Sequence, residues 1–205
     1  VITNLTRVAN DTAYIEINLR YDKSGRESVI EKNPGVIFVQ DVPDAAKKRY
    51  SEGMADLGKH PEKGLAELEE AVSIFPNYFD ALDSLGKEYV ARKDYEKAYP
   101  YLLRAIDVNQ RSYSTYYSLS YAFYQLKQYP AALEAAKATV FLVPGSMEAH
   151  LLYGTLLRLT GSYTEAEAAL LKANSLAKKM NSEVHWQLSL LYNRLNRTQD
   201  TISEL

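Results

Sequence analysis

The sequence predicts an all-α solenoid of antiparallel helix pairs, preceded by a small antiparallel β meander. Two patterns predict this architecture. From about residue 79 onward, small and aromatic residues recur every 34 positions, as at Tyr95, Tyr129 and Tyr163, which is typical of stacked helical repeats. Residues 14–21 instead alternate between apolar and polar, which is typical of a half-buried strand. We therefore expect a β-rich appendage over residues 1–43 and a helical domain over residues 44–205.

The first 43 residues carry the strand pattern. We expect strands over residues 2–8, 14–21, 28–30 and 36–39, because turn-forming residues such as Asp22 to Gly25 and Asn33 to Gly35 separate the apolar stretches. A sheet of this size is marginal when isolated. We therefore expect it to pack on the first helices or to belong to a larger β domain.

The helical domain is defined by columns of residues one repeat apart. Each unit has two apolar stretches at helical spacing joined by a short turn, so its helices must form an antiparallel hairpin. One hairpin cannot bury its apolar face alone, and stacked neighbours therefore supply the core. The predicted repeats cover about residues 44–78, 79–112, 113–146, 147–181 and, in part, 182–205. Two further columns are Ala98, Ala132 and Ala166, and Gly86, Ser120 and Gly154.

Local details of the repeats follow from residue chemistry. Gly86 and Ala98 are expected where the two backbones of a hairpin approach each other most closely. Thr139 replaces a usual alanine, and we expect its hydroxyl to bond back to the preceding turn. Three residues before first helices are expected N-caps: Ser112, Ser146 and Asn181.

These columns resemble the signature of tetratricopeptide repeat proteins. The best unit is DALDSLGKEYVARKDYEKAYPYLLRAIDVNQ, and the resemblance covers residues 44–205. It implies a right-handed superhelix in which the first helix of each hairpin lines a concave, partner-binding groove. The VQDVPDAAKKRY junction resembles the end of a carboxypeptidase-regulatory-like β module, which precedes such repeats in bacterial proteins. This second resemblance favours a bacterial extracytoplasmic setting, in the periplasm or cell envelope.

Composition limits the classes of partner. Lysine and arginine total 24 against 26 aspartate and glutamate, for a net charge of -2, so we expect no nucleic-acid binding. No apolar run approaches the roughly 18 residues of a membrane helix, and we expect no membrane insertion. The chain has no cysteine, which excludes disulfides, thiolate nucleophiles and sulfur-ligated metals. It begins at Val1 rather than methionine, and we expect it to be a piece of a longer protein.

No pattern indicates catalysis. The sequence contains no glycine-rich phosphate loop, nucleophile elbow or HExxH motif. His150 and His185 occupy equivalent repeat positions, but no third ligand lies at suitable spacing, so we interpret them as packing residues. We therefore expect neither an enzyme nor a resident cofactor or metal.

The resemblance assigns the groove to specific side chains. Tyr117, Tyr121 and Tyr124 share one helical face, and tyrosine suits recognition because it buries apolar area yet keeps a hydroxyl. The alternative is that these rings pack on one another or on other parts of the chain. The first repeat would contribute Lys48, Arg49, Glu52 and Asp56 to the groove. Because Glu52 would repel a carboxylate, we expect no binding of chaperone C-terminal tails. The predicted groove residues are Tyr117, Tyr121, Tyr124, Leu151, Arg158, Trp186 and Leu190.

These observations favour a non-catalytic interaction scaffold that binds a protein, as a peptide or partner helix, in the groove. One alternative is a structural module whose groove is filled internally and which forms a homo-oligomer through its C-terminal hairpin. Another is an accessory region of a larger enzyme.

Overall fold

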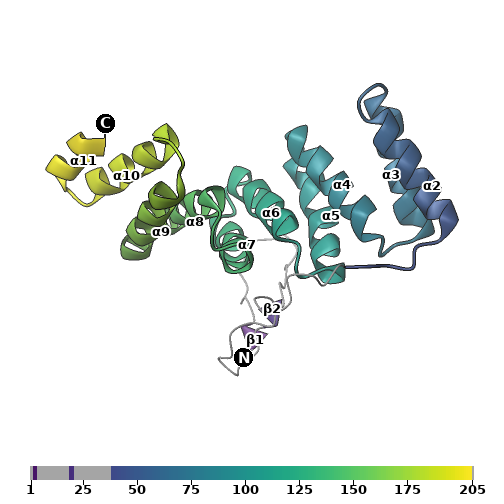
Figure 1. Cartoon of the computed structure of the whole chain (residues 1–205), viewed down its shortest axis with the longest axis horizontal. Helices are drawn as coiled ribbons and strands as arrows, with labels where there is room; N and C mark the ends of the chain where they lie inside the picture. Colours follow the sequence, from purple (N-terminus) through teal and green to yellow (C-terminus); the bar gives the residue numbers. More distant parts are fainter. Residues whose placement is uncertain (1, 4–18, 21–37, 205) are drawn as a thin grey trace. The chain divides into compact units, whose positions relative to one another are not determined.

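The computed structural model describes residues 2–3, 19–20 and 38–204 (Figure 1). The chain divides into two units, residues 1–39 and 40–205. In the first unit, β1 (Ile2–Thr3) and β2 (Leu19–Arg20) pair antiparallel, with Ile2 opposite Arg20.

Most of the predicted β meander lies outside the described residues. Two paired strands of two residues each do not establish a meander or its resemblance to a carboxypeptidase-regulatory-like module. Of the strand predicted over residues 36–39, the described residues Phe38 and Val39 are exposed and belong to no strand. The prediction of a strand at these two positions was wrong.

The second unit is an all-helical solenoid. Among residues 38–204, helices are the only regular secondary structure, and the period of 34 residues is visible in their spacing. The ten helices are α2 (Asp44–Asp56), α3 (Pro61–Ile74), α4 (Phe79–Ala91), α5 (Tyr95–Val108), α6 (Tyr113–Gln125), α7 (Tyr129–Leu142), α8 (Met147–Thr160), α9 (Tyr163–Leu176), α10 (Ser182–Arg194) and α11 (Thr198–Glu204).

Consecutive helices pack as hairpins, and each hairpin packs on the next. The pairs α2–α3, α4–α5, α6–α7, α8–α9 and α10–α11 follow one another along the unit (Figure 1). First helices also contact each other directly, α4 with α6, α6 with α8 and α8 with α10. Side chains from neighbouring repeats can therefore meet on the face that these helices form, which we call the first-helix face.

Small residues set the close approach within each hairpin. Ala98, Ala132 and Ala166 are fully buried, and a Cβ added at Gly86 would lie 2.5 Å from Cγ of Leu102. Ser120 occupies the glycine column and donates its hydroxyl hydrogen to the Ala132 carbonyl at 2.8 Å. The column of small residues therefore exists because the neighbouring helix leaves no room for larger ones.

Polar residues of the repeats largely follow their predicted roles. The Thr139 hydroxyl donates to the Ala135 carbonyl at 3.0 Å, which confirms the expected bond to the preceding turn. Ser146 and Asn181 accept hydrogen bonds from backbone amides of α8 and α10. Ser112 makes no such cap. Its hydroxyl accepts instead from Thr115 Oγ1 at 2.7 Å, so a neighbouring side chain competes with the backbone amide.

The segment before α2 is fastened to the second hairpin. Gln40 accepts a hydrogen bond from the Phe79 amide at 2.8 Å and donates one to the Asn77 carbonyl at 2.6 Å. Val42 is buried. One glutamine side chain thus joins the entry of the solenoid to the loop before α4.

Candidate functional site

The predicted groove residues all lie on first helices. Tyr117, Tyr121 and Tyr124 come from α6, whereas the other four come from α8 and α10. Because α6 contacts α8 and α8 contacts α10, these residues belong to three adjoining elements of the first-helix face. The remaining four are Leu151, Arg158, Trp186 and Leu190.

Two of the three tyrosines contact tyrosines at the start of second helices. The Tyr121 ring contacts Tyr95 edge-on, with centroids 6.2 Å apart, and Tyr124 at 6.4 Å. Tyr124 in turn contacts Tyr129 at 6.2 Å. Tyr95 and Tyr129 are the first residues of α5 and α7. Ring contacts of this kind are what we expect if Tyr117, Tyr121 and Tyr124, which we call the tyrosine stripe, pack within the protein and do not bind a partner.

Tyr117 has a different environment. Its side chain is half-buried, and burial together with the nearby Glu148 carboxylate raises the pKa of its hydroxyl. Like any neutral phenol, this hydroxyl can donate a hydrogen bond. Of the three tyrosines, Tyr117 is the one outside the ring contacts described above for Tyr121 and Tyr124.

Arg158 on α8 reaches across to α10. Its Nη2 and Nε donate to Oε1 of Gln187 at 2.9 and 3.2 Å, and Gln187 Nε2 donates to Glu183 Oε1 at 2.7 Å. Gln187 is only 6% exposed. Burial lowers the pKa of Arg158. A cation is thus held half-buried on the first-helix face by a neutral amide.

Arg194, at the end of α10, donates from Nε to the Tyr163 hydroxyl at 3.2 Å. This hydrogen bond raises the pKa of Arg194. The sequence predicted Tyr163 only as a member of a repeated column, and its contact with Arg194 was missed. The sequence offers only one sign of this contact: Arg194, in the next repeat, follows Tyr163 by 31 residues, slightly less than one repeat.

Apolar side chains lie near these arginines in the sequence of α8 and α10. Trp186 is 52% exposed, whereas Leu190 and Leu151 are half-buried. Leu151 packs against the core formed by the last repeats. Trp186 therefore offers the large exposed apolar surface of this end of the face.

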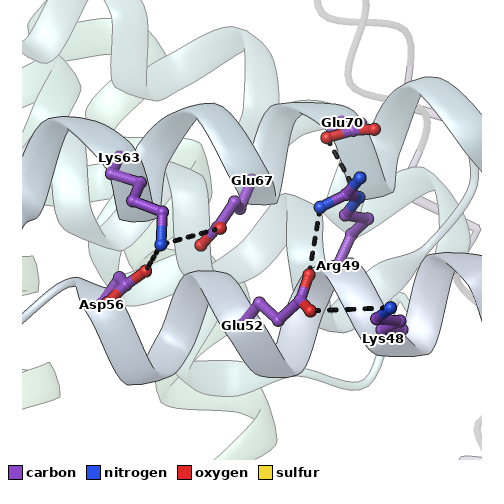
Figure 2. A network of polar contacts seen from close by, with 7 residues as sticks. All are labelled: Lys48, Arg49, Glu52, Asp56, Lys63, Glu67 and Glu70. Atoms are coloured by element: carbon purple, nitrogen blue, oxygen red, sulfur yellow. Dashed lines mark hydrogen bonds and ion pairs between the residues drawn. The ribbon is translucent and has the colours of Figure 1, made fainter.

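The first repeats present a contrasting, internally paired set of charges. Figure 2 shows Arg49 joined to Glu52 of its own helix and to Glu70 of α3, both at 3.1 Å. Lys63 of α3 donates to Asp56 at 2.5 Å. In the second hairpin, Lys87 donates to Asp83 of α4 at 2.5 Å and to Ser114 of α6 at 3.0 Å. The charged residues predicted for the groove in the first repeat are thus bound to other residues of the unit.

The Asp56–Lys63 contact makes the first hairpin sensitive to acid. The hydrogen bond from Lys63 lowers the pKa of Asp56 below its ordinary value. A carboxylate whose pKa is lower in the folded state than in the unfolded state stabilises the fold above the unfolded-state pKa. This contribution is lost as the pH falls through the folded-state pKa, here from about pH 4 downward. We expect amide exchange in α2 and α3 to become less protected over that range, measured by mass spectrometry.

Asp56→Asn should reduce this pH dependence, because an asparagine side chain does not titrate. Asp107→Asn, at an exposed position of α5, should leave it unchanged. An Asp56→Asn protein with the full acid sensitivity of the original would show that other groups control it.

The histidines have separate partners. His150 Nε2 lies 3.0 Å from the Pro144 carbonyl oxygen, and His185 Nδ1 lies 2.5 Å from Glu204 Oε2. Within the described ranges, no three histidine, aspartate or glutamate side chains are grouped as metal ligands. Across those same ranges, no helix combines the length and apolar character needed to cross a bilayer.

Comparisons with known proteins agree with the helical-repeat architecture. Residues 84–146 and 122–182 match a tetratricopeptide repeat family model. No curated protein matches the sequence significantly. Among solved structures, MamA (41-end) from Desulfovibrio magneticus RS-1 is 21% identical, with a TM-score of 0.73 over 80% of this chain and 92% of that chain.

Two other solved structures are similar. YrrB, described as a TPR protein with an unusual peptide-binding site, is 18% identical, with a TM-score of 0.73 over 86% of both chains. PilF of Pseudomonas aeruginosa is 17% identical, with a TM-score of 0.65 over 85% of this chain and 76% of that chain. At these identities the likeness concerns the fold.

Proposed function

Since the chain contains tetratricopeptide repeats, we propose that it is a non-catalytic scaffold that binds a peptide or partner helix on its first-helix face. The observation that carries the proposal is Trp186, which is 52% exposed on α10. An exposed tryptophan on a helical framework supplies the kind of rigid apolar anchor that dominates binding energy. The peptide-binding site named for YrrB, a protein of similar fold, supports the same kind of function here.

The third to fifth repeats are the part of the face best suited to binding. There Tyr117, Leu151 and Leu190 are half-buried and Trp186 is exposed. In the first two hairpins, by contrast, Arg49, Asp56 and Lys87 are engaged in ion pairs. A ligand at that end would have to displace these pairs, whereas the apolar end offers side-chain area that a partner can bury, so a partner gains more there.

The test is selection of binders from a random dodecapeptide library on the intact protein, followed by affinity measurement with variants. We expect Trp186→Ala to weaken binding of the selected peptides by about 2 kcal/mol, or about 30-fold, as for other interface tryptophans. Isothermal titration calorimetry measures this change.

Phe141→Ala is the matched control. Phe141 is also 52% exposed but lies on α7, a second helix, and its replacement should leave affinity unchanged. Selection of no peptide would argue against the proposed function. Equal affinities for the original protein and Trp186→Ala would remove Trp186 from the binding face.

Self-association through the fifth hairpin is the alternative. It is favoured by Ile202, which is exposed on α11, and by the lack of buried residues in the described part of that helix. Light scattering separates the two functions, because only self-association makes the mass rise with protein concentration. An accessory role in a larger enzyme is compatible with peptide binding and with self-association.

A further inference from the structure

Arg158 is a half-buried cation whose described hydrogen bonds lead to a neutral group. The ion pairs of the described chain do not include it. Its Nε and Nη2 both donate to Gln187 Oε1. Placing a guanidinium in a partly desolvated position is unfavourable unless a counter-charge compensates it. The arrangement therefore favours an anion from outside the described chain.

Two acidic residues of these repeats that could neutralise the arginines are already engaged. Glu183 accepts from Gln187 Nε2 at 2.7 Å, so the amide separates it from Arg158. Glu167 accepts two hydrogen bonds from Arg197, at 2.8 and 2.9 Å.

Arg194 is a second cation on a first helix of these repeats, at the end of α10. Tyr163 accepts the hydrogen bond from Arg194 and, like Tyr124, acts electrostatically on Arg158, so the two arginines have this tyrosine in common. The buried Gln187 holds Arg158 through Nε and Nη2, and the described bonds do not use Nη1. Trp186 directly precedes Gln187 on α10 and is half-exposed. Two arginines and an exposed apolar side chain thus belong to the adjoining first helices α8 and α10.

We propose that Arg158 and Arg194 bind the carboxylate of an aspartate or glutamate in the partner segment, next to an apolar residue that packs on Trp186. The proposal rests on the proposed peptide-binding function and adds the chemistry of the ligand. Guanidinium groups suit carboxylates because their planar N–H donors match the two oxygens. These arginines lie on the fourth and fifth hairpins, away from Lys48 and Glu52 of the first.

The composition of selected peptides tests this directly. Random dodecapeptides selected on the intact protein should be enriched in aspartate and glutamate beside an apolar residue. Selection on Arg158→Gln/Arg194→Gln should lose the acidic enrichment. Peptides without acidic enrichment on the original protein would overturn the carboxylate site but preserve peptide binding. Selection of no peptide would overturn both proposals.

A double-mutant cycle then tests the contact itself. Trp186 is the only tryptophan in the chain, so its fluorescence reports on peptide binding without a label. Replacing the acidic residue of a selected peptide by its amide should weaken binding to the original protein about tenfold or more, as expected for charge-assisted hydrogen bonds. The same replacement in the peptide should change its affinity for Arg158→Gln/Arg194→Gln little.

Controls separate specific contact from charge and folding. Arg111→Gln/Lys172→Gln removes the same net charge at exposed positions outside the first helices and should preserve the tenfold difference between the acidic peptide and its amide. Arg194→Gln alone keeps the Arg158–Gln187 contact and should reduce the difference while leaving the circular dichroism spectrum unchanged. An equal loss of affinity in the charge-matched control would overturn the carboxylate site.

Discussion

Replacing Gly64 with alanine is expected to destabilise the first hairpin by about 2 kcal/mol. A Cβ at this position would lie 2.7 Å from the Leu57 backbone nitrogen and 2.8 Å from the Gly53 carbonyl oxygen. Alanine gains about 1 kcal/mol of helix propensity over glycine, but overpacking costs about 3 kcal/mol when backbone must move. The clash therefore outweighs the gain in propensity.

Amide hydrogen exchange measures this effect best, because terminal repeats of a solenoid can unfold separately. We expect faster exchange in α2 and α3 and little change in α8 and α9. Gly58→Ala is the matched control, because no atom lies within 4 Å of a Cβ placed there. Unchanged exchange in α2 and α3 of Gly64→Ala would show that the two helices can separate without cost.

Replacing Tyr121 and Tyr124 together with serine is expected to destabilise the central repeats by about 3 kcal/mol, because it removes three aromatic contacts and their buried area. The contacts join these residues to each other, to Tyr95 and to Tyr129. Urea unfolding followed by circular dichroism measures the loss of stability.

Tyr113→Ser is the control for this variant. Tyr113 also lies on α6 and is 51% exposed, so its loss should change stability little. If the double variant keeps its stability but loses peptide binding, the two rings act as ligand contacts and not as packing residues. The outcome therefore distinguishes the two interpretations of the tyrosine stripe.

The helical hairpins could be predicted from sequence because their signal repeats. Gly86, Ser120 and Gly154 fill the same position in successive units, where Leu102 or Leu170 packs against each glycine and the Ala132 carbonyl accepts from the serine. A constraint imposed by backbone contact leaves the same residue type at each period, so it can be found without coordinates.

The partners of long side chains could not be predicted in the same way. Periodicity placed Arg49 and Asp56 on the first-helix face, yet both pair with α3. Such choices depend on the separation of two helices and on flexible side-chain torsions, neither of which is periodic in the sequence. The contact between Tyr163 and Arg194 was missed for the same reason.

The hydrogen bonds of the Gln40 side chain bear on how a pulling force at the N-terminal side would act on the solenoid. Because it holds Asn77 and Phe79, tension applied at the N-terminal side reaches the loop before α4 through two hydrogen bonds before it is transmitted along α2. Under such a pull, these two bonds would have to break before the tension loads the first hairpin.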